Sequence, residues 1–195
     1  MIKVFGHISP DTDATVSAIL WAWYLNTHTS SEATPYVLGT LNKETSFVLR
    51  RWNTDEPALL ESIQAGDQVT IVDTNNPQEL FTNLADAEIV QIIDHHMLAG
   101  GISTRKPIDM TLKPLASTAT VIHDLFGAHT ETMPENIKGH FNVLDLEANE
   151  LENLHPEELR KKFSSMKDKI QTYSNEFPWH ILCLVSHFKL QMKSL

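Results

Sequence analysis

The sequence is poor in cysteine and has no long apolar run. Its 195 residues include one cysteine, Cys183, so no disulfide can form within the chain, and a reducing cytoplasmic location is expected. No apolar stretch reaches the roughly 20 residues that a membrane-spanning helix needs. Residues 1–5 run into a histidine too early for a secretory signal. These absences predict a cytoplasmic protein with no membrane partner.

Basic residues are also scarce. Lys and Arg number 15 against 25 Asp and Glu, which gives a formal net charge of −10. Such a charge repels a phosphate backbone, so a nucleic-acid polymer is not expected as a partner. A small phosphate ester bound through metal ions remains compatible with it. The hydrophobic fraction of 42% is enough for the core of one ordinary domain.

Short β-branched runs alternate with helix-compatible segments along the first two thirds of the chain. Strands are predicted at residues 2–5, 35–39, 69–72, 89–93 and 108–112. Helices are predicted at residues 14–25, 43–52, 57–64, 77–84 and 117–126. For the hydroxyl residues at the start of the last helix, capping is the more frequent explanation, and contact with a ligand is the alternative. The alternation predicts an α/β fold, a Rossmann-like parallel sheet flanked by helices on both faces.

The composition changes from about residue 134 onward. Apolar residues recur at helical spacing over 159–173, which predicts an amphipathic helix. Residues 179–190 are strongly apolar and must pack on the core or on a second copy of the chain. A helical C-terminal segment is therefore expected after the sheet.

The first predicted strand leads into a loop that carries one imidazole and two carboxylates, His7, Asp11 and Asp13. Pro10 stops the strand, and the next helix begins directly afterwards. Carboxylates in the first turn of a helix are favoured by the helix dipole, which is one explanation for the two aspartates. That explanation gives His7 no role, and a metal site is the alternative.

Two later strands end in side chains of the same kind. One is followed by Asp73 and the other by Asp94, His95 and His96. The carboxyl ends of parallel strands lie along one edge of the sheet, so these groups are expected to converge. Their carboxylates would repel one another unless a cation compensates them. The predicted metal ligands are His7, Asp11, Asp13, Asp73 and His95.

This ligand set contains imidazole and carboxylate but no thiolate, which suits manganese, magnesium or iron, with zinc or cobalt possible. The ligands are more than one ion needs, so two ions with Asp73 as the bridge are predicted. A pair of metal ions at a sheet edge suits hydrolysis of a phosphoanhydride or phosphodiester. Asp94 is expected to orient His95, and His96 to donate to the phosphate or protonate the leaving group.

Several motifs in order resemble the DHH phosphoesterase superfamily, and within it the manganese-dependent family II inorganic pyrophosphatases. The matching residues are Gly6-His7-x-x-Pro10-Asp11-x-Asp13, Leu38-Gly39, Asn42-x-Glu44-Thr45, Val72-Asp73, Asp94-His95-His96 and Ser117-Thr118-Ala119-Thr120. The resemblance extends from residue 1 to about residue 139.

The resemblance implies hydrolysis of pyrophosphate to two orthophosphates by two Mn²⁺ ions, with Mg²⁺ or Co²⁺ as alternatives. One ion would be held by His7, Asp11 and Asp73. The other would be held by Asp13, Asp73 and His95. The resemblance also implies that His96 contacts the substrate and that the chain forms a homodimer through edge strands.

Two features depart from the family. By alignment, Ala148 falls where the family has a further metal-binding aspartate, and Asp145 or Glu147 could take its place. The family's basic C-terminal domain is not recognised, so a divergent, mostly helical tail at 140–195 is expected after a metal-binding domain at 1–139. Activity of the chain alone is expected to be low. A non-catalytic metal-binding or interaction module and a phosphodiesterase for short nucleotides are the alternative functions.

Overall fold

The computed structural model describes residues 1–144, with side chains to residue 141. The predicted helix at 159–173, the apolar segment at 179–190 and the departure at Ala148 lie outside the described residues. Among the described helices, none has the length and apolar character needed to cross a bilayer.

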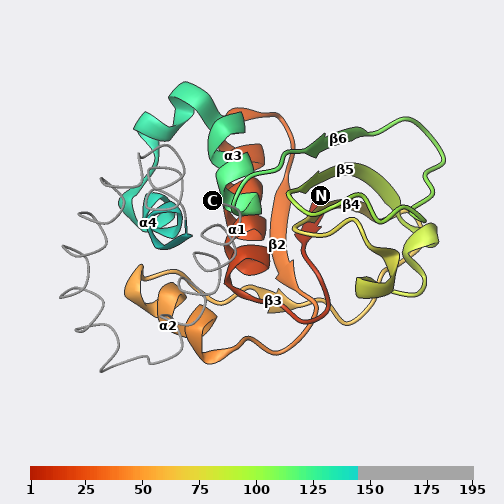
Figure 1. The fold of residues 1–195 in the computed structure, drawn as a ribbon, viewed down its shortest axis with the longest axis horizontal. Coiled ribbons are helices and arrows are strands. Elements are labelled where there is room, and N and C mark those ends of the chain that lie inside the picture. Colours follow the sequence, from red (N-terminus) through yellow and green to blue (C-terminus); the bar gives the residue numbers. More distant parts are fainter. Residues whose placement is uncertain (145–195) are drawn as a thin grey trace, which may run out of the picture. The chain divides into compact units, whose positions relative to one another are not determined.

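Six parallel strands form one sheet in the order β3-β2-β1-β4-β5-β6 (Figure 1). The strands are β1 (Ile2–Phe5), β2 (Ala33–Val37), β3 (Ala58–Leu59), β4 (Gln68–Val72), β5 (Glu88–Asp94) and β6 (Asp109–Leu112). The predicted α/β class and parallel sheet are confirmed. Because the chain moves outward in one direction from β1 and in the other from β4, the order reverses between these two strands. Such a reversal opens a crevice at the carboxyl ends of the strands.

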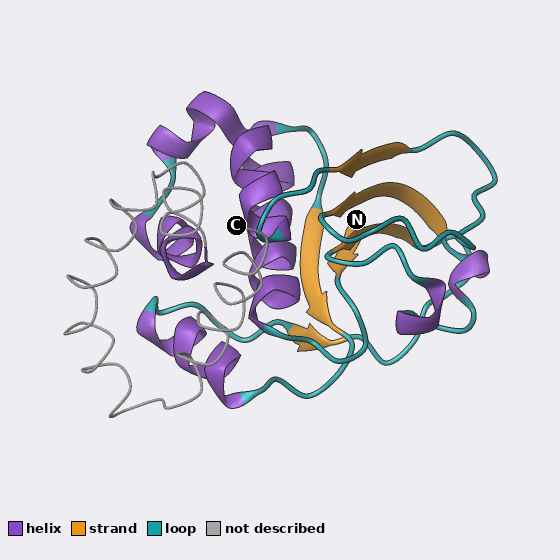
Figure 2. Ribbon diagram, viewed as in Figure 1, coloured by secondary structure: helices purple, strands orange, loops and turns teal. Residues whose placement is uncertain are grey.

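The α-helices of the described residues cover one face of the sheet (Figures 1 and 2). They are α1 (Thr12–His28), α2 (Lys43–Arg51), α3 (Thr118–Phe126) and α4 (Glu135–Leu144). Val4, Val72 and Ile93 point from the sheet into this layer, where they join Leu20 and Ile122. The sequence-based expectation of helices on a parallel sheet is met on this face.

The opposite face is covered differently from the prediction. Short 3-10 helices at Pro77–Glu79 and Leu84–Asp86, together with irregular segments, pack there. The prediction of one continuous helix at 77–84 is therefore wrong, because residues 80–83 between the two short helices are not helical. The face is still apolar and buried, since Phe5 and Ile71 are 0% exposed beneath this layer. Covering this face of the sheet requires enough apolar side chains, and irregular segments can supply them as well as a regular helix can.

The helix predicted at 57–64 is also wrong. Ala58 and Leu59 form the edge strand β3 beside β2, and the N–H of Leu60 donates to the carbonyl of Val37 at 2.9 Å. Leu60 and Ile63 then pack under the second face of the sheet. Backbone hydrogen bonds to an open strand edge, with burial of these side chains, outweigh the local helix signals of this segment.

Each of the first three helices begins with a side-chain cap. Asp11 accepts from the N–H of Ala14, Asn42 from that of Thr45, and Ser117 from that of Thr120. The capping explanation is thus confirmed for Ser117. Gly6 allows the turn into α1, because a Cβ there would lie 2.7 Å from the Cβ of Ala14.

Candidate metal centre

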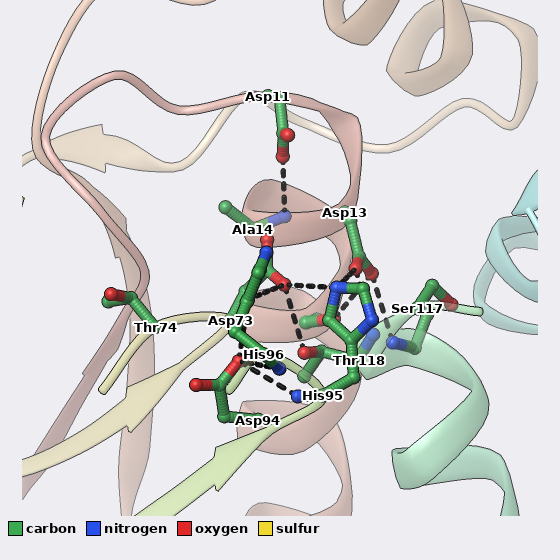
Figure 3. Close-up of polar contacts among 12 residues, drawn as sticks. Asp11, Asp13, Ala14, Asp73, Thr74, Asp94, His95, His96, Ser117 and Thr118 are labelled. Atoms are coloured by element: carbon green, nitrogen blue, oxygen red, sulfur yellow. Dashed lines mark hydrogen bonds and ion pairs between the residues drawn. The ribbon is translucent and has the colours of Figure 1, made fainter. Parts of the chain in front are cut away.

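The predicted ligands meet at the carboxyl edge of the sheet, at the point where the strand order reverses. Figure 3 shows four of them, Asp11, Asp13, Asp73 and His95. His7 follows β1, Asp73 follows β4, and Asp94 is the last residue of β5. Asp11 and Asp13 stand at the N-terminus of α1. Residues more than 80 positions apart in the chain are therefore gathered by the strand order alone.

Asp73 lies at the centre of the cluster and is 1% exposed. Its Oδ2 is 3.6 Å from the Nε2 of His7, and its Oδ1 is 3.5 Å from the Nε2 of His95. Its backbone has φ of +59°, a left-handed conformation that aspartate tolerates better than most residues. One buried carboxylate thus faces two imidazoles with its two different oxygens.

The separations between these ligand atoms fit shared cations better than direct hydrogen bonds. The nitrogen of His7 lies 3.7 Å from Oδ1 of Asp11, and that of His95 lies 3.7 Å from Oδ2 of Asp13. A direct N–H···O bond would be shorter, about 2.7–3.2 Å. Two ligands that each lie about 2.1 Å from one ion are roughly 3.0–3.4 Å apart.

One group of potential ligands consists of His7, Asp11 and Asp73, with ligand atoms all within 4.8 Å of one another. It is the same set that the resemblance implies for one ion. The facing carboxylates of Asp11 and Asp73 raise the pKa of His7 to about 10, against the effect of burial. A divalent cation would compete with this proton for the same ring nitrogen, so metal binding would release a proton.

The second group of potential ligands consists of Asp73, His95 and His96. The Nδ1–H of His95 donates to the carbonyl of Leu115 at 3.0 Å, which directs its Nε2 toward Asp73. A backbone carbonyl that fixes the tautomer in this way is typical of metal-binding histidines. Asp13 also faces this nitrogen, although it is not one of this group.

Helix α3 holds the carboxylate of Asp13 in place (Figure 3). The N–H of Thr118 donates to Oδ2 of Asp13 at 2.8 Å, and the N–H of Ala119 donates to Oδ1 at 2.9 Å. The hydroxyl of Thr118 also donates to Oδ1 of Asp73 at 2.9 Å. The N-terminus of α3 therefore positions two of the predicted ligands and stabilises their negative charge.

Asp94 does not orient the ring of His95, contrary to the sequence-based expectation. Its Oδ1 accepts from Nδ1 of His96 at 2.8 Å, and from the backbone N–H groups of His95 and His96. Leu115 has taken the expected role through its carbonyl. Sequence reasoning missed this contact because a backbone carbonyl 20 residues away leaves no sign in the residue types.

Burial and neighbouring charges shift the pKa values of the aspartates in this cluster. Burial, followed by the charge of Asp13, raises the pKa of Asp73 well above its ordinary value. Burial also acts to raise the pKa of Asp11, but the His7 ring and the N–H of Ala14 hold it below the ordinary value. A divalent cation beside Asp73 would favour its ionised form.

The donor set fits manganese. Among the described residues, the cluster offers imidazole nitrogens and carboxylate oxygens without a thiolate, and Mn²⁺ binds both kinds of donor. A cleft of about 440 Å³ opens beside it, lined by His7, Ile8, Ser9, Asp73, Thr74, Asn75, Asn76, Glu79, His96, Met97 and Ala99. These lining residues include no lysine or arginine.

Two polar residues of this region were not singled out as site residues from the sequence. Thr118 belongs to the Ser117–Thr120 motif, for which contact with a ligand was only the alternative to capping, and its hydroxyl donates to Asp73. Asn75 was interpreted only as part of a turn, yet it is 2% exposed and contacts Asp94. A polar residue directly after a predicted strand end was the signal available in the case of Asn75.

Comparison with known proteins identifies the family to which this chain is similar. The DHH family, N-terminal domain, matches residues 1–146. The manganese-dependent inorganic pyrophosphatase of Methanocaldococcus jannaschii is 41% identical over 126 residues, 65% of this chain and 38% of that protein. A probable manganese-dependent inorganic pyrophosphatase of Staphylococcus haemolyticus is 39% identical over 123 residues, 63% of this chain and 40% of that protein.

Solved structures agree with these relatives. A crystal structure described as that of a putative family II inorganic pyrophosphatase from Methanococcus jannaschii aligns with a TM-score of 0.59 at 40% identity, over 66% of this chain and 39% of that one. An exopolyphosphatase-related protein from Bacteroides fragilis aligns with a TM-score of 0.53 at 18% identity, over 72% of this chain and 44% of that one, and shows the fold alone. The chain thus spans 38% to 40% of the length of the two curated relatives above.

Proposed function

The chain belongs to the DHH family, and from this premise we propose that it provides the metal-binding part of a manganese-dependent site that hydrolyses inorganic pyrophosphate to two orthophosphates. The observation that carries the proposal is Asp73, whose two carboxylate oxygens face His7 and His95 separately. The relatives named as manganese-dependent inorganic pyrophosphatases support the choice of metal and substrate.

We assign one ion to His7, Asp11 and Asp73, and the other to Asp13, Asp73 and His95. When bound, the metal ions would polarise phosphoryl oxygens and lower the pKa of a water nucleophile. Asp73 would bridge the two positions, because a different oxygen faces each side. His95 presents Nε2 to its position, since its Nδ1–H is held by Leu115.

His96 is assigned to the substrate rather than to a metal. Its Nδ1 is 2.8 Å from Asp94 but 3.8 Å from Asp73, so the first contact holds the ring. That contact leaves Nε2 as the nitrogen available to the cleft. In its protonated form His96 would donate from Nε2 to the leaving phosphate.

The reaction requires one water for each pyrophosphate. A bond forms between the water oxygen and one phosphorus, the bond from that phosphorus to the bridging oxygen breaks, and a water proton ends on the leaving phosphate. Pyrophosphate is highly charged, yet the described residues that line the cleft include no lysine or arginine. We therefore expect the described residues by themselves to bind pyrophosphate weakly.

Manganese binding and phosphate release together test the proposal. Calorimetric titration of the metal-free chain with MnCl₂ should give two ions per chain, and orthophosphate should appear from pyrophosphate only with the metal. Asp73→Asn should weaken both, whereas Asp67→Asn, at the opposite end of the strand that precedes Asp73, should weaken neither. Absence of Mn²⁺ binding, or activity that Asp73→Asn leaves intact, would contradict the proposal.

The same experiment separates the alternatives. Mn²⁺ binding without hydrolysis of any substrate would indicate a non-catalytic metal-binding module. Faster release of mononucleotide from a short dinucleotide than of phosphate from pyrophosphate would indicate a phosphodiesterase. The first result would remove the proposed reaction and the second would replace its substrate, while both would keep the metal centre.

A homodimer and a cytoplasmic location remain predictions. The strand β6 lies at one edge of the sheet, and Met110 on it is 40% exposed. An exposed edge strand can pair with a second copy. Light scattering after size-exclusion chromatography would give the mass of the particle, and the mass of a monomer would contradict the dimer.

A further inference from the structure

The loop that carries His96 has little packing of its own. It runs from Asp94 at the end of β5 to Ala99, without regular secondary structure. Met97 and Leu98 within it are 92% and 67% exposed. A loop with so few buried apolar contacts needs polar contacts to hold one conformation. His96 could not keep one orientation toward a substrate otherwise.

Asn75 provides such contacts from the neighbouring strand end. Its Nδ2 donates to Oδ2 of Asp94 at 2.5 Å and to the carbonyl of Met97 at 3.0 Å. Its Oδ1 accepts from the N–H of Ala99 at 2.6 Å. The start, the middle and the end of the loop are therefore tied to one side chain that is 2% exposed.

The contact with Asp94 continues to His96 (Figure 3 shows the second half of this path). Asn75 donates to Oδ2 of Asp94, and Oδ1 of Asp94 accepts from Nδ1 of His96 at 2.8 Å. Asp94 is fully buried, so its orientation depends on Asn75, on the His96 ring and on the backbone N–H groups of His95 and His96, and not on water. Fixing Oδ2 fixes the direction in which Oδ1 points.

We propose that Asn75 is a positioning residue that sets the orientation and tautomer of His96 through Asp94. The orienting effect rests on contacts within the chain alone. Its consequence for catalysis rests on the function proposed above.

Asn75 also belongs to a turn, which is the competing explanation for its presence. The adjacent Asn76 performs that task, since its Oδ1 accepts from the N–H of Gln78 and caps the short helix at Pro77–Glu79. Asn76 lines the same cleft, but within the described part of the chain its hydrogen bonds join Thr74, Gln78 and Glu79 rather than the His96 loop. Asn76→Ala is therefore a matched control for Asn75→Ala.

The test is the imidazole nitrogen spectrum of the metal-free chain by NMR, at a pH where His96 is neutral. His96→Gln identifies the His96 signals. The wild-type chain and Asn76→Ala should show His96 as the Nδ1–H tautomer. Asn75→Ala should show a mixture of tautomers for His96, while His95 stays unchanged because Leu115 holds it. A wild-type His96 signature in Asn75→Ala would overturn the proposal.

Asn75→Ser keeps a small polar group at the position and serves as the second variant if Asn75→Ala does not fold. Its His96 signal should also lose the single tautomer, because a serine hydroxyl cannot donate to Asp94 and Met97 while accepting from Ala99. A wild-type signature in a folded Asn75→Ser would equally overturn the proposal.

Kinetics give the catalytic consequence. With Mn²⁺ and pyrophosphate, Asn75→Ala should lower kcat about tenfold, within the range for loss of an outer-shell partner. The same change should have less effect in an Asp94→Ala background, because it acts through Asp94. Equal effects in both backgrounds would contradict that route. If the wild-type chain hydrolyses no pyrophosphate, the proposed function fails, and the NMR result still decides the role of Asn75.

Discussion

Asp73 combines two unfavourable conditions, burial and a neighbouring carboxylate. Burial and the charge of Asp13 raise its pKa, while Thr118 and His7 supply hydrogen-bonding and ionic partners. A carboxylate in this position is costly unless a cation compensates it. At the scale of single residues, the need for a compensating cation thus comes from the buried Asp73 more than from the exposed Asp11.

Asp73→Asn should reduce Mn²⁺ affinity more than Asp11→Asn. Asparagine keeps the shape of the side chain but removes the charge that faces both His7 and His95. We expect a loss beyond the roughly 10–100-fold that removal of an outer-shell partner produces. Calorimetric titration with MnCl₂ measures both variants. Equal losses would show that Asp73 does not bridge two ions.

Thr118→Val should destabilise the metal-free chain by about 1–3 kcal/mol, because it leaves a buried oxygen of Asp73 without its donor. Valine has nearly the same shape, so packing should change little. Urea denaturation gives the free energy of unfolding. Thr27→Val removes an exposed hydroxyl that bonds only within α1, and should stay within about 0.5 kcal/mol of wild type.

At the scale of elements, the N-termini of α1 and α3 serve the site, whereas that of α2 serves stability. Asp11 caps α1 and also faces His7. Ser117 caps α3, whose first N–H groups hold Asp13. The cap of α2, Asn42, contacts Thr45 and not the predicted ligands. The hydroxyl of Thr45 lies 3.1 Å from that of Thr12 in the first turn of α1, so the first turns of the two helices touch, but the capping side chain itself contacts none of the predicted ligands.

Asn42→Ala should lower the free energy of unfolding by about 1 kcal/mol, since the first turn of α2 loses its acceptor. Mn²⁺ affinity should be unchanged. Asn42→Asp preserves an acceptor oxygen and should remain close to wild type. Thermal unfolding followed by circular dichroism measures the effect. A loss of Mn²⁺ affinity in Asn42→Ala would show that α2 takes part in the site.

At the scale of the whole molecule, the helical layer is closed by α4, which carries the fully buried His140. Its Nε2 is 2.9 Å from the hydroxyl of Thr54, a residue that follows α2. Burial lowers the pKa of His140 to about 4. The closure of this layer therefore requires a neutral imidazole.

Acid should weaken this closure. The unfolded chain, with a histidine pKa near 6.5, takes up the proton before the folded chain does, so stability falls as pH falls from about 6.5 toward 4. The contribution has a limiting slope of about 1.4 kcal/mol per pH unit. His140→Gln cannot take up this proton. The stability difference between wild type and His140→Gln should therefore change over this range, and a constant difference would contradict the prediction.

Comparing wild type with His140→Gln also cancels the contribution that other titrating groups make to the pH dependence of stability. His7, whose pKa is raised to about 10, loses its stabilising proton as pH rises from about 6.5 toward 10. It does so in both proteins, at the other end of the pH range. Urea denaturation at pH 4.5, 5.5 and 6.5 is sufficient for the comparison.

The sequence by itself determined the parallel α/β sheet, four of the strand ends and the residue types of the candidate metal centre. Hydrophobic runs and capping residues act over a few positions, so they can be identified without the fold. His7, Asp73 and His95 could be brought together in advance because parallel strands share one carboxyl edge. The prediction that Asp94 orients the ring of His95 was wrong. Adjacency in sequence does not specify which nitrogen a carboxylate contacts, and Asp94 contacts the ring of His96 and only the backbone N–H of His95.

Only the tertiary structure decided how these groups are held. The edge strand at Ala58–Leu59 exists because β2 offers an open edge there. The contacts of Thr118 with Asp73, of Leu115 with His95 and of Asn75 with Asp94 join segments far apart in the chain. Hydrogen bonds are short and directional, so their partners are fixed by the register of strands and the placement of helix ends, which local sequence patterns do not encode.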